Sequence, residues 1–312
     1  MLHRCNATES TNSGLVAATL RRKVSIPVVA TRSGVGVHSG VLGIAPALPM
    51  GVRVGKRYGA AMDLGLRGKR ALVTGGSSGL GLGCAAALAA EGVSVVLVAR
   101  SQERLDRAAA SLQPAHSASV HTVVADVGKV NEVQHAVDEA TRLLGGIDIL
   151  IANAGGPPGG DFAHTDLEAY LPAIELNLLS TVAMCKAVVP AMCERGWGRV
   201  VAITSVSVRQ PIANLILSNT ARAGLTGFLK TLAREVAATG VTVNSLQPGL
   251  HATDRLVGLY QDPAEMAATV PAKRLGDPGD FGRVAAMLCS DAASFITGAA
   301  VPVDGGAYAG LQ

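Results

Sequence analysis

The stretch Thr74-Gly75-Gly76-Ser77-Ser78-Gly79-Leu80-Gly81 joins a short apolar run, residues 71–74, to a run rich in alanine and leucine, residues 81–91. The first run is typical of a buried strand and the second of a helix, so the glycines lie at a strand-to-helix junction. Glycine there permits a tight turn and lets a diphosphate approach the backbone, while the free N–H groups of the helix N-terminus attract negative charge. The stretch therefore predicts a dinucleotide site that opens a βαβ unit.

The same alternation continues to the end of the chain. Short β-branched runs predict buried strands at 71–74, 93–98, 120–124, 147–151, 200–203, 241–244 and 300–303. Alanine- and leucine-rich runs predict helices between them, among them 81–91, 102–112, 130–144, 166–193 and 221–238. Continuous apolar strands that alternate with helices are typical of a parallel sheet covered on both faces. We expect an α/β fold: a single doubly wound, Rossmann-type domain over residues 62–312 with a seven-stranded parallel sheet.

The net charge of +4 is unevenly distributed along the 312 residues. Residues 1–61 hold eight basic groups and one acid, which gives +7, whereas residues 62–312 hold nineteen basic and twenty-two acidic groups, which gives −3. A mildly acidic body argues against a nucleic-acid partner. The first segment has no persistent helix or strand period, and we expect a basic N-terminal extension that is disordered or comes from a misassigned start codon. Its arginine-rich, acid-poor composition also resembles an organelle transit peptide, which stays an alternative.

Cysteine spacing and hydropathy exclude several classes of site. The five cysteines, at 5, 84, 185, 193 and 289, show no CxxC pair and no metal-like spacing, so we expect no metal site and buried thiols in a reducing, cytoplasmic location. No run of 18 residues is apolar without interruption; residues 34–52 come nearest and contain His38, Ser39, Pro46 and Pro49. We therefore expect no membrane partner.

Further landmarks follow the glycine stretch in a fixed order along the predicted strands. They are Asp126, Asn153-Ala154-Gly155, Asn177, Ser205, Pro248-Gly249, Thr253 and Val303-Asp304-Gly305-Gly306. With the spacing TGxxxGxG, this order resembles the short-chain dehydrogenases/reductases over residues 66–308, and in particular proteins similar to 3-oxoacyl-carrier-protein reductases. The resemblance implies an oxidoreductase that acts on a carbonyl/alcohol pair of a small molecule. It also implies a homotetramer or homodimer, formed through the helices at 166–193 and 213–238 and the C-terminal segment.

The end of the second strand predicts which nicotinamide cofactor binds. An NAD(H) site places a carboxylate there for the ribose hydroxyls, but Val98-Ala99-Arg100-Ser101 contains no acid. Arg100 can pair with a 2′-phosphate, which favours NADP(H) over NAD(H); the alternative is a solvated arginine at a helix start. The resemblance implies these further cofactor contacts: Gly75, Ser77, Ser78, Gly79, Leu80, Gly81, Asp126, Val127, Asn153, Ala154, Gly155, Arg222, Pro248, Gly249 and Thr253.

The catalytic helix departs from the family pattern. The family carries Tyr-x-x-x-Lys starting thirteen residues past its serine, where this chain has Ser218 and Arg222, and none of its four tyrosines precedes a lysine at that spacing. In the family the tyrosine exchanges a proton with the substrate oxygen and the lysine holds the nicotinamide ribose. We expect Ser205, Asn177, Ser218 and Arg222 to form an atypical catalytic site. Loss of a positioned general acid costs about 10²- to 10⁴-fold in rate.

Two other groups and one loop could take part. His251, two residues past Pro248-Gly249, is a candidate acid or base, with a surface histidine as the alternative. Arg209, in the loop after Ser205, could polarise a carbonyl or hold a carboxylate, or be a solvated charge. The loop at 155–160, Gly-Gly-Pro-Pro-Gly-Gly, resembles a divergent subgroup that also has Ser-Asn-x-x-Arg, and we expect it to reshape the active-site wall; a spacer loop is the alternative.

Three functions fit this pattern. The first is an NADP(H)-dependent oxidoreductase with altered proton transfer. The second is a non-redox reaction on the same scaffold, such as dehydration, retro-aldol cleavage or isomerisation. The third is a catalytically impaired protein that binds NADP(H). Since a fold alone does not decide among them, net oxidation of the cofactor is the observation that discriminates.

Overall fold

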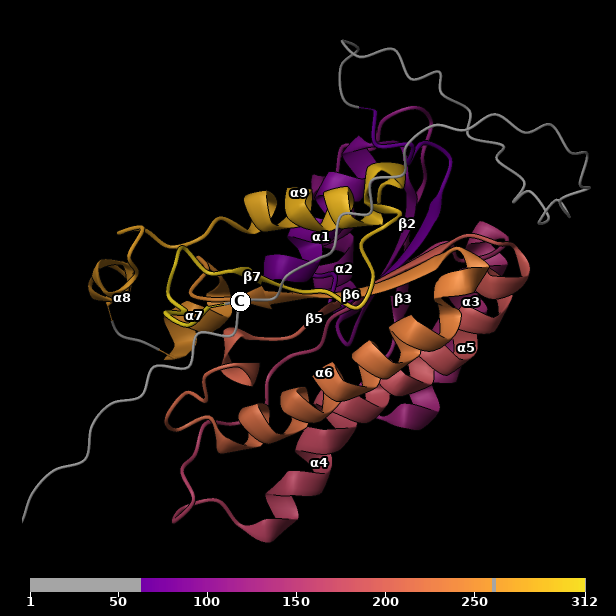
Figure 1. Ribbon diagram of the computed structural model, residues 1–312. Coiled ribbons are helices and arrows are strands. Elements are labelled where there is room, and N and C mark those ends of the chain that lie inside the picture. Colours follow the sequence, from indigo (N-terminus) through magenta and orange to yellow (C-terminus); the bar gives the residue numbers. More distant parts are fainter. Residues whose placement is uncertain (1–62, 260–261, 312) are drawn as a thin grey trace, which may run out of the picture. The chain divides into compact units, whose positions relative to one another are not determined.

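The computed structural model describes residues 63–259 and 262–311, and the extension predicted for residues 1–61 lies outside them. Within the described part of the chain, seven parallel strands form one sheet (Figure 1). They are β1 (Arg70–Thr74), β2 (Ser94–Ala99), β3 (Val120–Val124), β4 (Ile149–Ala152), β5 (Gly198–Ile203), β6 (Val241–Pro248) and β7 (Ala300–Val303). Their order, β3-β2-β1-β4-β5-β6-β7, confirms the predicted doubly wound α/β fold.

This order fixes where a ligand can bind. The chain runs outward from β1 to β3 and then returns to the other side of β1 as β4. The connections therefore diverge between β1 and β4, and such a switch point opens a crevice at the carboxyl ends of the strands. The glycine stretch follows β1 and so lies in this crevice.

Helices cover both faces of the sheet. In chain order they are α1 (Gly79–Ala90), α2 (Gln102–Ser111), α3 (Val130–Leu144), α4 (Tyr170–Ile174), α5 (Ser180–Glu194), α6 (Ile216–Val236), α7 (Asp254–Leu259), α8 (Pro263–Thr269) and α9 (Pro278–Cys289). One core cluster joins the sheet to α3, α5 and α6, and a second joins it to α1, α2 and α9. In Figure 1, α1 and α9 lie together on one side of the strands, and α5 and α6 on the other.

Glycines allow α1 and α9 to approach each other closely. A Cβ on Gly83 would overlap the carbonyl of Pro278, and a Cβ on Gly282 would overlap the carbonyl of Gly83. Neither position can carry a side chain without moving one backbone away from the other. This contact joins the helix that follows the glycine stretch to the last long helix of the chain.

The helix predicted at 166–193 is interrupted. A π-helical turn, Glu175–Leu179, separates α4 from α5 and contains the buried Asn177. Turns of this kind are rare and often occur at functional sites. By length and composition, the stretch Leu167–Glu194 is apolar enough to cross a membrane. However, Met184, Cys185 and Val188 of α5 belong to the core beside the sheet, which accounts for much of this hydropathy.

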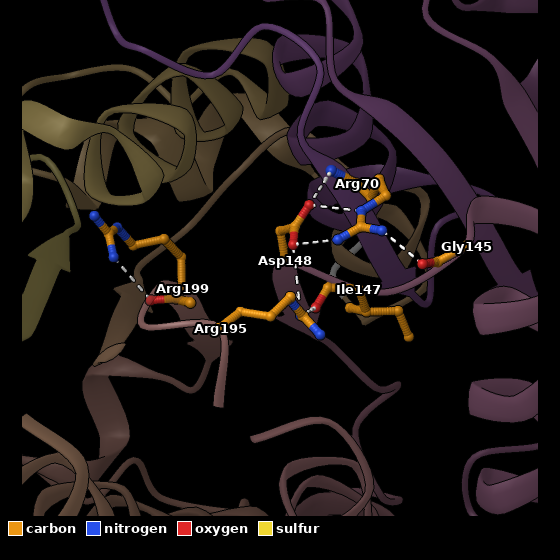
Figure 2. A network of polar contacts seen from close by, with 7 residues as sticks. Arg70, Gly145, Ile147, Asp148, Arg195 and Arg199 are labelled. Atoms are coloured by element: carbon orange, nitrogen blue, oxygen red, sulfur yellow. Dashed lines mark hydrogen bonds and ion pairs between the residues drawn. The ribbon is translucent and has the colours of Figure 1, made fainter. Parts of the chain in front are cut away.

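A network of ion pairs lies at the amino-terminal ends of the strands (Figure 2). Arg70 holds Asp148 in a bidentate pair, with Nε 2.8 Å from Oδ2 and Nη2 2.7 Å from Oδ1. Its Nη1 donates to the carbonyl of Gly145 at 2.6 Å, and Arg195 lies 3.4 Å from Asp148 while it donates to the carbonyl of Ile147. The carboxylate that precedes β4 is therefore shared between two guanidinium groups.

Candidate active site

The glycine stretch forms a turn that leaves the start of α1 open. Gly75 and Gly79 adopt φ of +57° and +54°, a left-handed conformation that glycine tolerates, and a Cβ on Gly81 would overlap the carbonyl of Gly75. The side chain of Ser78 does not cap α1, and the first turn of α1 contains no acidic residue. By contrast, α2, α8 and α9 each start at a side chain that accepts a helix N–H. The N-terminus of α1 thus keeps donors for an anion, as a diphosphate requires.

Two contacts hold neighbouring loops around this turn. The hydroxyl of Thr74 donates to the carbonyl of Asn153 at 2.8 Å and accepts its backbone N–H at 3.0 Å, while Nδ2 of Asn153 donates to the carbonyl of Gly75 at 3.3 Å. These bonds join the ends of β1 and β4. On the other side, Thr253 lies beside Gly79, with its Cγ2 3.3 Å from the position of a Cβ there. The loops after β1, β4 and β6 therefore converge on one crevice.

The end of β2 supplies positive charge to the same crevice. Arg100 is exposed directly after β2. Arg104, in the first turn of α2, donates from Nη2 to the hydroxyl of Ser78 at 3.2 Å and lies 3.7 Å from the exposed carboxylate of Asp254. Arg104 was not singled out in the sequence analysis. Its position three residues after Ser101, the cap of α2, was a usable signal, because the first turn of that helix faces the crevice.

Two acidic side chains, Asp126 in the loop and Glu132 on α3, hold the loop that follows β3. The Asp126 backbone N–H donates to Oε2 of Glu132 at 2.8 Å, and its carboxylate accepts the N–H of Gly128 at 3.0 Å. This leaves Asp126 half-buried at the carboxyl end of β3. The other predicted cofactor residues lie at or next to the carboxyl ends of β1, β3, β4 and β6: Ser77, Leu80, Val127, Ala154, Gly155, Pro248 and Gly249.

Asn177 reaches into the crevice from the π-helical turn. Its Nδ2 donates to the carbonyl of Gly155 at 2.7 Å. Its Oδ1 is buried and has no hydrogen-bond partner among the residues that the structure describes. A buried acceptor without a protein partner calls for a water or a ligand donor. The structure thus brings Asn177 to the loop that follows β4, and its predicted part in catalysis stays a prediction.

Arg222 and Ser218 lie on one buried face of α6, one turn apart. Nη1 of Arg222 donates to the carbonyls of Ile203 and Thr204, at 2.8 and 2.9 Å, which places the guanidinium at the end of β5 next to Ser205. Burial and the charge of Arg255 lower the pKa of Arg222 to about 10. The hydroxyl of Ser205 accepts the N–H of Ser207 at 3.1 Å and starts a short 3₁₀ turn.

The loop at 155–160 is tied to two other elements. The Gly160 N–H donates to the carbonyl of Asn214 at 2.7 Å, and its carbonyl accepts the N–H of Ile216 at 3.2 Å, so the loop pairs with the start of α6. At its other end, Gly156 lies against the guanidinium of Arg255 on α7, where any Cβ would overlap that group. The loop therefore forms a wall between α6 and α7.

Arg209 does not reach the crevice as expected for a substrate-binding residue. Its Nε donates to Oε1 of Gln247 at 2.7 Å and its Nη2 to the carbonyl of Ala300 at 2.6 Å, while its guanidinium lies 5.6 Å from the ring centre of Tyr308. These contacts use the guanidinium to join β6, β7 and the C-terminal segment. The structure therefore corrects both readings of Arg209, the substrate contact and the solvated charge.

His251 is buried on the side of α9 rather than exposed in a loop. Its ring packs edge-on against Phe281, with centroids 5.1 Å apart, and lies over Gly276, where a Cβ would be 2.5 Å from Cδ2. Burial lowers its pKa, and its Nδ1 lies 3.2 Å from the carbonyl of Gly249. The burial of His251, at 5% exposure, contradicts the surface alternative, whereas its assignment as a candidate acid or base stays a prediction.

The described residues contain no metal-binding cluster, and three of their cysteine thiols are unreactive. No group of three or more histidine, cysteine, aspartate or glutamate side chains lies close enough there to bind a metal. Burial raises the pKa of Cys185 and of Cys289 to about 12, and it raises the pKa of Cys84 as well. These three thiols are therefore not nucleophiles at neutral pH.

Comparisons with known proteins agree with this geometry. The family model described as enoyl-(acyl carrier protein) reductase matches residues 75–308. Dehydrogenase/reductase SDR family member 4 of Bos taurus is 38% identical over 250 residues, which cover 79% of this chain and 89% of that protein. The chain belongs to the short-chain dehydrogenase/reductase family. The 3-oxoacyl-[acyl-carrier-protein] reductase FabG of Aquifex aeolicus (strain VF5) is 32% identical over 248 residues, 79% of this chain and all of that protein.

Solved structures of this family share the same architecture. L-sorbose reductase from Gluconobacter frateurii, complexed with NADPH and L-sorbose, superposes with a TM-score of 0.76 at 34% identity and covers 80% of this chain and 100% of that one. A single-substitution variant of actinorhodin polyketide ketoreductase with NADPH gives a TM-score of 0.72 at 32% identity over 77% of this chain and 97% of that one. The protein is thus a short-chain dehydrogenase/reductase, an NAD(P)-dependent oxidoreductase.

Proposed function

We propose that the protein is an NADP(H)-dependent reductase of small carbonyl compounds, similar to 3-oxoacyl-carrier-protein reductases. In this proposal Ser218 and Arg222 replace the tyrosine and lysine of the family motif. The observation that carries the proposal is the guanidinium of Arg104 on the Ser78 hydroxyl, beside the uncapped N-terminus of α1. This arrangement offers a diphosphate the helix N-terminus and offers a 2′-phosphate a guanidinium fork and a hydroxyl.

The preference for NADP(H) follows from the charges near the end of β2. No carboxylate stands directly after β2, where it would accept hydrogen bonds from free ribose hydroxyls. Instead, Arg100 follows the strand and Arg104 lies in the first turn of α2. Asp254 is the only carboxylate within 4 Å of Arg104 among the described residues, and at 3.7 Å and 88% exposure it is a weak competitor for a phosphate. The NADPH complexes of similar reductases support the same choice.

The proposed chemistry assigns each buried group one task. Bound NADPH supplies the hydride. Ser205 and Ser218 donate hydrogen bonds to the substrate oxygen, and Arg222 keeps the site positive as negative charge develops on that oxygen. The free Oδ1 of Asn177 can accept a hydrogen bond from a solvent water, and in this proposal that water supplies the one proton that the substrate oxygen gains. Because a serine hydroxyl is a far weaker acid than a phenol, we expect turnover about 10²- to 10⁴-fold slower than with a tyrosine.

A direct test separates binding from turnover. The full-length protein is titrated with NADPH and with NADH by cofactor fluorescence, and a panel of ketones and aldehydes is then followed both by cofactor absorbance and by product mass. We expect tighter binding of NADPH and slow reduction with one cofactor oxidised per product.

Each other outcome removes a part of the proposal. Absence of binding by either nucleotide contradicts it entirely. Product formation without cofactor oxidation would identify a non-redox reaction on this scaffold. NADPH binding with no product from any carbonyl would identify a binding protein that has lost catalysis.

We also propose that the protein assembles into a homodimer or homotetramer. Large apolar side chains are exposed on and near α4, at Phe162, Leu167, Leu171 and Leu179. Exposed apolar patches on this scale often mark contacts between subunits. Light scattering coupled to size-exclusion chromatography measures the mass, and a monomer at micromolar concentration would contradict this assignment.

A further inference from the structure

Two arginines at the carboxyl ends of the strands have no acidic partner among the described residues. Arg222 is buried at 8% exposure, and those residues give only backbone carbonyls to its Nη1 and no acceptor to its Nε or Nη2. Arg255, on α7, is exposed and forms no ion pair or hydrogen bond with any described residue. Two uncompensated guanidinium groups in one crevice repel each other, and a negative ligand removes that cost.

The loop at 155–160 holds Arg255 in place. The guanidinium lies on the backbone of Gly156, a position that no other residue could occupy without displacing it. The preceding carbonyl, of Gly155, is in turn held by Asn177 at 2.7 Å. This chain of contacts runs from the π-helical turn to α7, and it holds the exposed guanidinium of Arg255 near enough to Arg222 for its charge to affect that group.

The neighbouring acids lie within ion-pair distance of other groups, the exposed Asp254 only weakly. Asp254 is adjacent in sequence but pairs with Arg104 at 3.7 Å, and Asp161 on the nearby loop pairs with His164 at 2.7 Å. The two arginines also influence each other: burial and Arg255 lower the pKa of Arg222, and burial lowers that of Arg255. Both groups stay charged at neutral pH, so the local field is positive and available to a ligand.

We propose that Arg255, supported by Arg222, binds a carboxylate of the substrate, so that the enzyme reduces oxo acids in preference to neutral ketones. A planar guanidinium fork binds a carboxylate through two parallel hydrogen bonds. These bonds raise the affinity for the substrate and also fix the orientation of its carbonyl group. This inference rests on the proposed reductase function, because it names the substrate class of the same site.

Matched acid and ester pairs test the inference. The full-length protein, saturated with NADPH, is assayed with acetoacetate against methyl acetoacetate and with levulinate against methyl levulinate. Saturable binding of each carboxylate is also measured by calorimetry. We expect kcat/KM for each acid to exceed that of its ester by about 10- to 100-fold, as for hydrogen bonds to charged groups.

The variants locate the effect. Arg255→Gln should raise KM for the acids by about the same factor and change KM for the esters much less, so that the preference for the acids is lost; Arg255→Lys should restore part of that preference. Arg142→Gln removes one exposed charge on α3, outside the crevice, and serves as the control. Equal rates for acids and esters, an equal loss of both in Arg255→Gln, or absence of carboxylate binding to a protein that binds NADPH would overturn the inference. Failure to bind NADPH would instead contradict the proposed function.

Discussion

Arginines at the two ends of the sheet have opposite surroundings. At the amino-terminal ends of the strands, Arg70 and Arg195 share the carboxylate of Asp148 (Figure 2). At the carboxyl-terminal ends, Arg222 and Arg255 have no carboxylate among the described residues and are held by carbonyls and by Gly156. Charges that are paired inside the chain contribute to stability, whereas charges left unpaired are available to a ligand. The comparison predicts that changes at one end affect unfolding and changes at the other affect binding and turnover.

The largest expected effect is a gain of activity at the carboxyl-terminal ends. The double substitution Ser218→Tyr/Arg222→Lys should raise kcat for carbonyl reduction by about 10²- to 10⁴-fold, because it restores a positioned phenolic acid. This corresponds to about 3–5 kcal/mol of barrier. Stopped-flow absorbance of NADPH measures it. Thr220→Tyr/Arg234→Lys introduces the same two side chains on the exposed face of α6 and should have no effect. An unchanged kcat in the first variant would mean that the surrounding pocket serves another reaction.

At the amino-terminal ends the expected effect is on folding. Asp148→Asn should lower the free energy of unfolding by about 2–3 kcal/mol, since it leaves two guanidinium groups without a counter-charge in a partly buried site. Urea denaturation followed by circular dichroism measures this loss. Asp138→Asn, on the exposed face of α3, is the matched control. If Asp148→Asn also weakened NADPH binding, the separation between the two ends would be wrong.

Arg104 tests the cofactor side of the crevice. Arg104→Gln should raise the Kd for NADPH about tenfold, because a charge-assisted contact with the 2′-phosphate is lost, and should leave the Kd for NADH unchanged. Fluorescence titration measures both constants. Arg107→Gln is the control: it removes a charge from the same helix, but Arg107 pairs with Glu103 and not with Ser78, so both Kd values should stay unchanged. An equal rise in the Kd values for NADPH and NADH would show that Arg104 contacts the diphosphate or the loop instead of the 2′-phosphate.

The smallest effect is a dependence of stability on pH. Burial alone would raise the pKa of Asp148, but hydrogen bonds and charge from Arg70, with Arg195, outweigh it and hold this pKa below its ordinary value of 3.8. A group with a lowered pKa stabilises the fold above its unfolded pKa and loses that contribution as pH falls through the folded value. The stability difference between wild type and Asp148→Asn should therefore be constant above about pH 5 and shrink below about pH 4. A difference that grew on acidification would contradict this assignment.

The fold could be predicted from local pattern, because each buried parallel strand is a short apolar run. The positions of Asn177 and Arg222 in the chain could also be predicted, because each lies at a recognisable spacing from other motifs of the family. Arg209 was assigned wrongly and the burial of His251 was missed, because their positions depend on Gln247 and Phe281, partners that are distant in sequence. Arg255 was missed for the same reason: only the folded loop brings Gly156 beneath it. The assignments of cofactor and substrate contacts stay predictions until they are measured.

The contact between α1 and α9 has a consequence for biosynthesis. Gly83 and Gly282 touch although they are 199 residues apart in the sequence. A ribosome therefore releases the glycine turn early, but the surface on which its helix rests emerges only near the end of translation. Until then the nascent chain exposes one face of α1, and such non-local closure is slow. Thus α1, the first helix among the described residues, packs fully only after α9 has been made, and we expect a chain truncated before α9 to fail to form its nucleotide crevice.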